Sequence, residues 1–170
     1  MKYVFALLAA AGLVFAASGD SALPNFHQVN NHLFRGAQPS PAGFRTLAHM
    51  GIKTVIDLRE ESHAAGEEKI VEAEGMRYIS LPMNGLEAPS DQQVEHALAL
   101  IDDAANGPVF VHCHRGADRT GTVVACYRIA HEGWENRQAL DEARGFGMSW
   151  MEFGMHKYVL HYHTATASSR

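Results

Sequence analysis

The chain has 170 residues, of which 46% are hydrophobic, 19% charged and 9% aromatic. This ordinary composition excludes a disordered, collagen-like or coiled-coil chain, and the length fits a single domain. A formal net charge of -5 argues against a nucleic-acid partner, because such proteins carry basic surfaces. Two cysteines are too few for a disulfide scaffold.

The first eighteen residues have the order of a secretory signal. Lys2 precedes an apolar run from Tyr3 to Ala17, and small residues follow it. The run is shorter than the roughly 20 residues that cross a bilayer, so we expect no stable membrane span in the mature chain. We predict a signal peptide over 1–18, cleaved after Ser18, and one domain over 19–170 that is periplasmic or secreted. A buried first helix is the alternative.

Strand and helix signals alternate along the rest of the chain. Apolar runs predict strands over 32–36, 52–58, 76–81 and 109–112. Capping residues such as Ser40 before Pro41, and Ser90 with Gln93, help to predict helices over 41–50, 60–74, 91–105, 119–131, 136–144 and 149–163. The small, polar segment 164–170 is expected to fray. This order predicts an α/β fold: a central, mostly parallel sheet of about four to five strands with helices on both faces.

The segment that carries chemistry follows the fourth predicted strand. It reads His112-Cys113-His114-Arg115-Gly116-Ala117-Asp118-Arg119-Thr120. In open α/β sheets ligands bind at the carboxyl ends of strands, and the amides of a helix N-terminus attract anions. Gly116 lets the loop curl, and the planar guanidinium of Arg119 matches phosphate oxygens. Residues 114–119 are therefore predicted to bind a phosphate group, and we call them the cradle.

Cys113 is expected at the base of the cradle. Helix N-termini and nearby guanidinium groups favour a thiolate, which is a nucleophile toward a bound phosphate monoester. The product is a phosphocysteine that water hydrolyses. We expect Thr120 to donate its hydroxyl to the sulfur and His112 to orient the cysteine through hydrogen bonds.

The segment HCHRGADRTG resembles the HC-x5-R-[ST] signature of cysteine-based protein tyrosine phosphatases, and of their dual-specificity branch in particular. The segments FRGAQP at 34–39 and VIDLR at 55–59 resemble small bacterial phosphatases of this type. This resemblance, over 33–133, implies a dual-specificity-phosphatase-like fold and phosphate-monoester hydrolysis without metal or other cofactor. It also implies that Cys113 is the nucleophile, Arg119 the phosphate clamp and Thr120 the stabiliser of the thiolate.

The general acid is the point at which the sequence departs from the family. Family members usually place an aspartate on a separate loop before the cysteine, but the window 81–87 contains none. Asp118, inside the cradle, is our predicted acid, with pairing to Arg115 as its structural alternative. Glu87 on the expected loop is the second candidate. Asp91 is discounted, because a carboxylate in the first turn of a helix is explained by the helix dipole.

The substrate class stays open between phosphotyrosine, phosphoserine or phosphothreonine proteins and phosphoinositides or inositol phosphates. His114 and Arg115 form a basic rim that suits a ligand with several phosphates, although a solvated rim is equally consistent. One alternative function is a non-catalytic module that binds a phosphorylated protein, small molecule or lipid head group in the same cradle. Sulfur or arsenate chemistry is another, but sulfur-transfer loops are usually shorter.

Other conspicuous residues have structural explanations. Cys126 is expected in the core, too far from Cys113 for a disulfide. Asp57 and Arg59 are expected to form a structural pair or loop anchor, and Arg35 to brace the cradle. A metal site is not predicted, because zinc needs three or four convergent ligands and the cradle amides face anions. The histidines considered for such a site are His112, His114, His156, His161 and His163.

Overall fold

The computed structural model describes residues 22–60 and 66–164. The predicted signal peptide and the end of the predicted fraying tail lie outside the described residues. Within these two ranges, no helix combines the length and apolar composition that a bilayer crossing requires.

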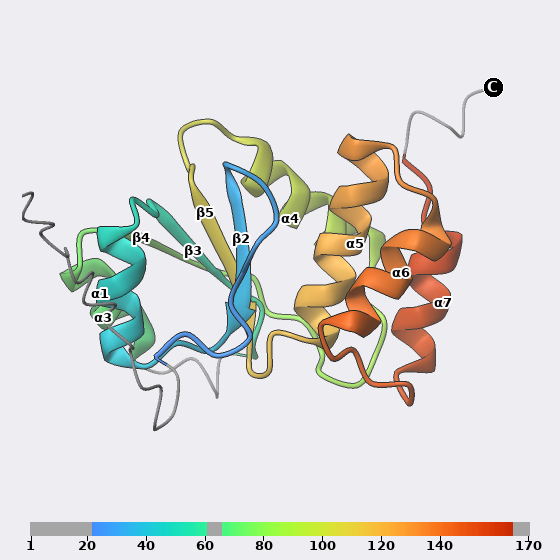
Figure 1. Cartoon of the computed structure of the whole chain (residues 1–170), viewed down its shortest axis with the longest axis horizontal. Coiled ribbons are helices and arrows are strands. Elements are labelled where there is room, and N and C mark those ends of the chain that lie inside the picture. The colour runs from blue at the N-terminus through green and yellow to red at the C-terminus, as the bar shows by residue number, and fades with distance from the viewer. Residues whose placement is uncertain (1–21, 61–65, 165–170) are drawn as a thin grey trace, which may run out of the picture.

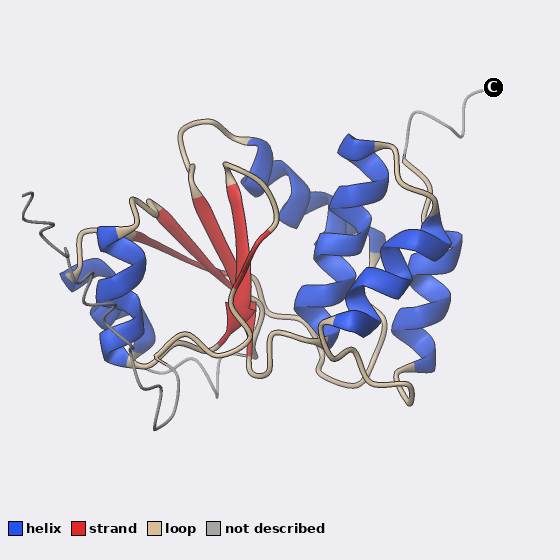
Figure 2. Ribbon diagram, in the orientation of Figure 1, coloured by secondary structure: helices blue, strands red, loops and turns tan. Residues whose placement is uncertain are grey.

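A five-stranded sheet lies at the centre of the molecule (Figure 2). The strand order is β1 (His27–Gln28), β2 (Leu33–Ala37), β5 (Val109–Cys113), β3 (Thr54–Asp57) and β4 (Arg77–Ser80). The pairs β2–β5, β5–β3 and β3–β4 are parallel, which confirms the predicted sheet, and only β1 is antiparallel. β1 was not predicted, because two residues are too few to show a periodic pattern.

Helices cover both faces of the sheet (Figure 1). One face carries α1 (Pro41–His49) and α3 (Glu67–Ala73). The other carries α4 (Asp91–Asp102) and α5 (Asp118–Glu132), and α6 (Asn136–Gly145) and α7 (Phe153–His161) form a further layer on α5. The predicted helix starts are confirmed at Ser40, whose hydroxyl accepts from the Gly43 amide, and at the Ser90–Gln93 capping box.

Three predicted helices are shorter than expected by more than one residue, and the one predicted over 91–105 ends at Asp102. The helix predicted over 60–74 begins at Glu67, after Gly66 in the left-handed region at φ 89°; residues 61–65 of that prediction lie outside the described residues. The helix predicted over 149–163 spans Phe153–His161, and the Ser149 amide before it donates to the Asp118 carboxylate.

Strand β5 separates two neighbouring residues of the signature. Successive side chains of a strand point to opposite faces of the sheet. Val111 and Cys113 pack into the core beneath α4 and α5, whereas Phe110 and His112 face the side of α1 and α3. The cysteine and the histidine before it therefore have different surroundings.

Candidate active site

The cradle connects β5 to α5 and turns sharply at Gly116. This residue has φ 67°, in the left-handed region, and a Cβ there would collide with the backbone of Gly36 and Ala37 on β2. Only glycine satisfies both conditions. The loop is therefore pressed against the end of the neighbouring strand.

Three successive carbonyl groups of the cradle are bonded to residues 25–38, the segment that contains β2 and its flanking residues. The bonds are Gln38 N to His114 O at 3.2 Å, Asn25 Nδ2 to Arg115 O at 3.1 Å and to Gly116 O at 3.2 Å, and Arg35 Nη2 to Gly116 O at 2.8 Å. These contacts fix the orientation of three consecutive peptide groups.

The orientation of these peptides decides where their N–H groups point. In a trans peptide the N–H points opposite to the C=O. The amides of Arg115, Gly116 and Ala117 are thus directed away from residues 25–38, and no residue of that segment lines the cavity described below. Converging N–H groups of this kind attract an anion.

Arg35 and Asn25 support the loop from behind. Arg35 is only 1% exposed, and its guanidinium lies 4.7 Å from the Phe146 ring centroid. Burial lowers the pKa of Arg35 to about 10. The prediction that Arg35 braces the cradle is confirmed. Asn25 was missed, because it lies in an irregular segment without a motif; its left-handed φ of 49° is visible only in the structure.

Cys113 lies at a cavity of about 430 Å³. The residue is 2% exposed and ends β5. Arg119 lines the same cavity, and its Nη1 donates to the carbonyl groups of Leu58 and Met83, both at 3.4 Å. The remaining lining residues are Arg59, Glu60, Gly85, Leu86, His114, Arg115, Asp118 and Glu152. The structure therefore brings Cys113, Arg119 and the predicted rim residues together.

The two predicted contacts to the cysteine have different outcomes. The Thr120 hydroxyl is fully buried and has no hydrogen-bond partner among the described residues, so the expected bond to the sulfur is not formed. His112 Nδ1 lies 3.3 Å from the Cys113 carbonyl oxygen, and its ring is on the opposite face of the sheet from the thiol. The predicted contact of His112 with the cysteine is therefore present, and it is made to the cysteine backbone.

The candidate acids occupy different places. Asp118 lines the cavity, and its carboxylate accepts from Arg115 Nη2 at 2.6 Å and from the Ser149 amide at 2.8 Å. The predicted pairing with Arg115 is thus present, and it raises the pKa of Arg115. Glu87 is exposed and does not line the cavity. Asp91 accepts from the Tyr158 hydroxyl at 2.9 Å and also lies away from the cavity.

Two acids that line the cavity, Glu60 and Glu152, were not predicted. They come from loops outside the signature. Nothing in the sequence indicates that these loops meet at Cys113.

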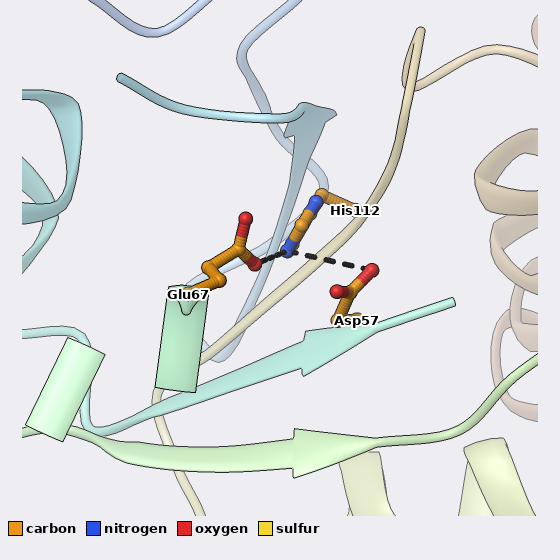
Figure 3. A group of neighbouring side chains, drawn as sticks. All are labelled: Asp57, Glu67 and His112. Atoms are coloured by element: carbon orange, nitrogen blue, oxygen red, sulfur yellow. Dashed lines mark ion pairs between the residues drawn. The ribbon is translucent and has the colours of Figure 1, made fainter. Parts of the chain in front are cut away.

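Behind the cradle lies a buried charge network on the α1–α3 side of the sheet (Figure 3). Arg59 Nη2 donates to Asp57 at 2.7 Å and to Glu67 at 2.6 Å, and the Tyr78 hydroxyl donates to Asp57 at 2.8 Å. Burial opposes ionisation of Asp57, but the hydrogen bonds from Arg59 hold its pKa below the usual value. The predicted Asp57–Arg59 pair is confirmed. The participation of Glu67 in this network was not predicted.

His112 completes this network. Its Nε2 lies 2.9 Å from Glu67 Oε1 and 3.9 Å from Asp57 Oδ1. Within the described part of the chain, these three side chains are the group of ligand-type residues close enough together to hold a metal ion. His156 and His161 instead contact Arg144 and the Lys157 carbonyl.

Cys126 is fully buried on α5, and burial raises the pKa of its thiol. Neither cysteine forms a disulfide. Cys126 is therefore a core residue, as predicted.

Exposed apolar side chains are concentrated on the two segments that contribute Leu86 and Glu152 to the cavity. Among the described residues, five large apolar side chains are exposed, and four of them, Leu86, Trp150, Met151 and Phe153, lie on the two segments that border the cavity. We call these four residues the apolar rim. Such a concentration of exposed apolar surface is characteristic of a binding site.

Comparison with known proteins agrees with this geometry. Residues 13–157 match a family model described as a DSP-PTPase phosphatase fused to NAD+ kinase. The chain belongs to this family. The predicted resemblance is confirmed, and the cradle, Cys113 and Arg119 occupy the segment on which it was based.

The curated relatives of this chain carry the names of more than one kind of phosphatase. The chain is 30% identical over 126 residues to the inositol diphosphatase DSP4 of Arabidopsis thaliana, covering 72% of this chain and 63% of that protein. It is 31% identical over 128 residues to the dual specificity protein phosphatase TpbA of Pseudomonas aeruginosa, covering 72% and 56%. The chain thus spans less than two thirds of the length of these curated relatives.

Solved structures agree on the fold. The crystal structure of P. aeruginosa TpbA superposes with a TM-score of 0.72 at 28% identity, covering 86% of this chain and 89% of that one. The core catalytic domain of SIW14 from S. cerevisiae superposes with a TM-score of 0.76 at 21% identity, covering 88% and 92%, and supports the fold alone. The dual-specificity-phosphatase-like architecture is confirmed.

Proposed function

We propose that this protein is a phosphatase that hydrolyses phosphate monoesters through a phosphocysteine on Cys113, without metal or other cofactor. One observation carries the proposal. Three cradle carbonyls are held by residues 25–38, which directs the amides of Arg115, Gly116 and Ala117 to the side where Cys113 and Arg119 lie. Such a set of donors binds the oxygens of a phosphoryl group.

In the first step, the Cys113 thiolate attacks phosphorus in line with the ester oxygen. The S–P bond forms, the P–O bond breaks, and the leaving oxygen takes a proton. The charge that develops on the phosphoryl oxygens is stabilised by the cradle amides and by Arg119.

In the second step, water attacks the phosphocysteine, and the thiolate leaves with release of inorganic phosphate. The buried Thr120 hydroxyl lacks a partner in the structure, so it is available to the sulfur as negative charge returns to it. We propose that Thr120 stabilises the leaving thiolate in this step.

Asp118 is our proposed proton donor in the first step. Its carboxylate accepts from Arg115 and from the Ser149 amide, so the role requires Arg115 to exchange Asp118 for a phosphate oxygen when substrate binds. The Arg115 side chain is largely exposed, which permits this movement. Glu152 lines the same cavity and is the competing candidate, ahead of Glu87.

The role of the acid is tested by varying the leaving group. A proton donor matters most when the leaving oxygen is strongly basic. We expect Asp118→Asn to slow an alkyl phosphate far more than p-nitrophenyl phosphate, whereas Glu152→Gln and Glu87→Gln slow both esters equally or neither. If Glu152→Gln instead slows the alkyl phosphate far more than p-nitrophenyl phosphate, Glu152 is the proton donor.

The reaction class is tested with p-nitrophenyl phosphate and the variants Cys113→Ser and Arg119→Lys. We expect turnover by the wild type in the presence of EDTA, loss of turnover in Cys113→Ser, and a covalent phosphate on Cys113 in acid-quenched samples by mass spectrometry. Phosphate-ester binding without turnover would instead support the recognition module. Persulfide formation or arsenate reduction without ester hydrolysis would support the alternative of sulfur or arsenate chemistry.

The substrate we favour is a phosphorylated protein. By name, the P. aeruginosa relative is a protein phosphatase and the Arabidopsis relative an inositol diphosphatase. A soluble inositol phosphate offers no apolar surface to the rim of Leu86, Trp150, Met151 and Phe153, whereas the side chains flanking a phosphorylated residue do. The basic His114 and Arg115 keep inositol phosphates and phosphoinositides as the second candidate.

A substrate panel separates these two classes. We expect kcat/KM to be highest for phosphopeptides with apolar flanking residues and to fall in Trp150→Ser, while p-nitrophenyl phosphate turnover is unchanged. Preferred hydrolysis of a soluble inositol phosphate or of phosphoinositide vesicles, unaffected by Trp150→Ser, would overturn this assignment.

We further propose that the protein is exported. The support is the order of charged, apolar and small residues over 1–18. Fractionation of cells that express the full chain, followed by N-terminal sequencing, is expected to give an exported product that begins at Gly19. Recovery of the intact chain in the cytoplasm would contradict export.

A further inference from the structure

A second hollow, of about 900 Å³, lies on the side of the sheet that carries α4, α5 and α7 (Figure 1). We call it the groove. One wall is α4, the other is α7 with the residues that follow it, and the last turn of α5 contributes Ala130 and His131. Among the described residues, none lines both the groove and the cavity at Cys113. The proposed phosphatase mechanism therefore leaves the groove unused.

The groove begins where the border of the Cys113 cavity ends. Leu86 and Glu152 line the cavity, and Ala88 and Gly154, each two residues further along the chain, line the groove. Ala88 and Gly154 are neighbours in space, since a Cβ on Gly154 would lie 3.4 Å from the Ala88 amide nitrogen. Two extended residues span about 7 Å. A polypeptide bound at Cys113 can therefore continue across this contact into the groove.

The lining of the groove includes two tyrosine rings. Tyr158 and Tyr162 are half-buried against the core of α4 and α5, and their ring centroids lie 6.1 Å apart. Leu98 and Ala99 of α4 add further apolar surface. Surfaces of this kind pack against the methylene stems of lysine and arginine, and aromatic rings attract the charged ends of these side chains.

The charge of the groove is predominantly negative. Counted with neutral histidines, its lining carries one ammonium group, Lys157, and three carboxylates, Asp91, Glu95 and Asp102. Intervals of four and seven residues place the three carboxylates on one face of α4, over about 17 Å of its length. This excess of negative charge attracts a cationic ligand and repels an anionic one.

The three carboxylates keep oxygen atoms for a ligand. Asp91 Oδ1 accepts from the Tyr158 hydroxyl at 2.9 Å, and Asp102 Oδ2 lies 3.1 Å from His131 Nε2, so each of these acids has a second oxygen without a partner among the described residues. Glu95 is exposed and forms no hydrogen bond or ion pair within the described part of the chain. Glu95 is therefore the carboxylate most open to a new ion pair.

We propose that the groove binds a basic segment of the phosphorylated polypeptide, close in sequence to the residue whose phosphate lies at Cys113. This inference rests on the proposed function, because it adds a second contact to the same substrate. An inositol phosphate offers no cation to the α4 carboxylates, and the net charge of -5 disfavours a second copy or an anionic membrane as the occupant. At about 3.3 Å per extended residue, the carboxylates correspond to a stretch of about five residues.

Three phosphotyrosine peptides with identical apolar flanks test the proposal. They carry three lysines, glutamines or glutamates about four to nine residues from the phosphotyrosine, before it in one set and after it in another. Each kcat/KM is divided by that for p-nitrophenyl phosphate, so that a general change in the enzyme cancels. An exposed ion pair contributes up to about fivefold, so we expect the lysine peptide of one set to exceed the glutamine peptide by about tenfold. This preference should vanish near about 1 M salt, because charges are then screened.

Glu95→Gln tests the groove, and Glu72→Gln is the matched control. Glu72 is exposed on α3, on the other face of the sheet, and its substitution removes the same charge. We expect Glu95→Gln to reduce the preference for lysine over glutamine by about two- to fivefold and Glu72→Gln to retain it. Equal preferences in Glu95→Gln and the wild type, or a wild type that does not prefer lysine in either set, would overturn the proposal.

A binding measurement separates this proposal from the proposed function. The lysine peptide without its phosphate is titrated into Cys113→Ser, and the backbone amides are followed by nitrogen-15 NMR. We expect shifts on α4 and α7 that weaken when Glu95→Gln is added, and this result would stand even if no ester were hydrolysed. Shifts confined to other elements would refute the groove even if every peptide is hydrolysed. A dimer in sedimentation that Glu95→Gln dissociates would also refute it, because a second copy would then occupy the groove.

Discussion

Asn25 connects the N-terminal segment to the two loops that frame the active site. Its Nδ2 lies 3.1 Å from Arg115 O, 3.2 Å from Gly116 O and 3.0 Å from Phe146 O. The amide nitrogen carries two hydrogens, so these three contacts amount to two hydrogen bonds of about 0.5–1.5 kcal/mol each. Removing the side chain should therefore cost about 1–3 kcal/mol of unfolding free energy.

The backbone of Asn25 provides an internal comparison. At φ 49°, glycine is unstrained, whereas alanine adds about 1–2 kcal/mol. We expect Asn25→Gly to lower the free energy of unfolding by about 1–3 kcal/mol and Asn25→Ala by a further increment of about 1–2 kcal/mol. Both variants should lower kcat/KM for p-nitrophenyl phosphate by about tenfold or more, because the cradle amides lose their fixed direction.

Urea unfolding and steady-state kinetics measure the two effects separately. Asn30→Gly is the control, because Asn30 Oδ1 accepts from the amides of His32 and Leu33 in the same segment without contacting the cradle. It should lose stability and retain kcat/KM. If Asn25→Gly retains full kcat/KM, or if Asn30→Gly loses as much, the carbonyl contacts do not set the direction of the cradle amides.

Three further predictions concern the cradle, the core and the buried network. Gly116→Ala should abolish turnover and destabilise the fold more than Gly133→Ala, which has the same left-handed backbone but open space at its Cβ; kinetics and urea unfolding measure both. Cys126→Ala should leave alkylation by iodoacetamide unchanged, because its thiol is buried with a raised pKa, and labelling at this site would contradict that. The pKa of Asp57 is held below 3.8, so the stability that its ionised carboxylate contributes is present above pH 3.8 and is lost as the pH falls through the lower pKa of the folded state. The free energy of unfolding of Asp57→Asn, measured by urea unfolding, should therefore depend less on pH in that window than the free energy of unfolding of the wild type.

The sequence predicted the features that depend on local patterns. β-branched runs identified the parallel strands, and the strand–cradle–helix order placed Cys113 and Arg119 at the same cavity. These features follow from nearest neighbours along the chain. The family signature could be recognised because it lies in one continuous segment of the chain.

The features that the sequence did not predict depend on contacts between distant segments. Asn25 reaches the cradle across 90 positions of the chain, and Glu152 reaches the cavity from the loop before α7. Glu67 begins a short helix and has the sequence context of a solvated charge. The expected contact of His112 with the cysteine is present at the Cys113 carbonyl, but the approach of its ring to Glu67 was not predicted, because strand alternation directs the ring to the opposite face of the sheet.

Trp150 gives the molecule a fluorescent reporter on the segment that contributes Glu152 to the cavity. The chain has two tryptophans, and Trp134 is covered by the Arg128 guanidinium at 4.6 Å, whereas Trp150 is 72% exposed and neighbours the ring of Phe153. In a Trp134→Phe background the remaining emission comes from Trp150 alone, on a segment that borders the cavity. Quenching by acrylamide would then follow the arrival of a ligand in real time, even for compounds that are never turned over.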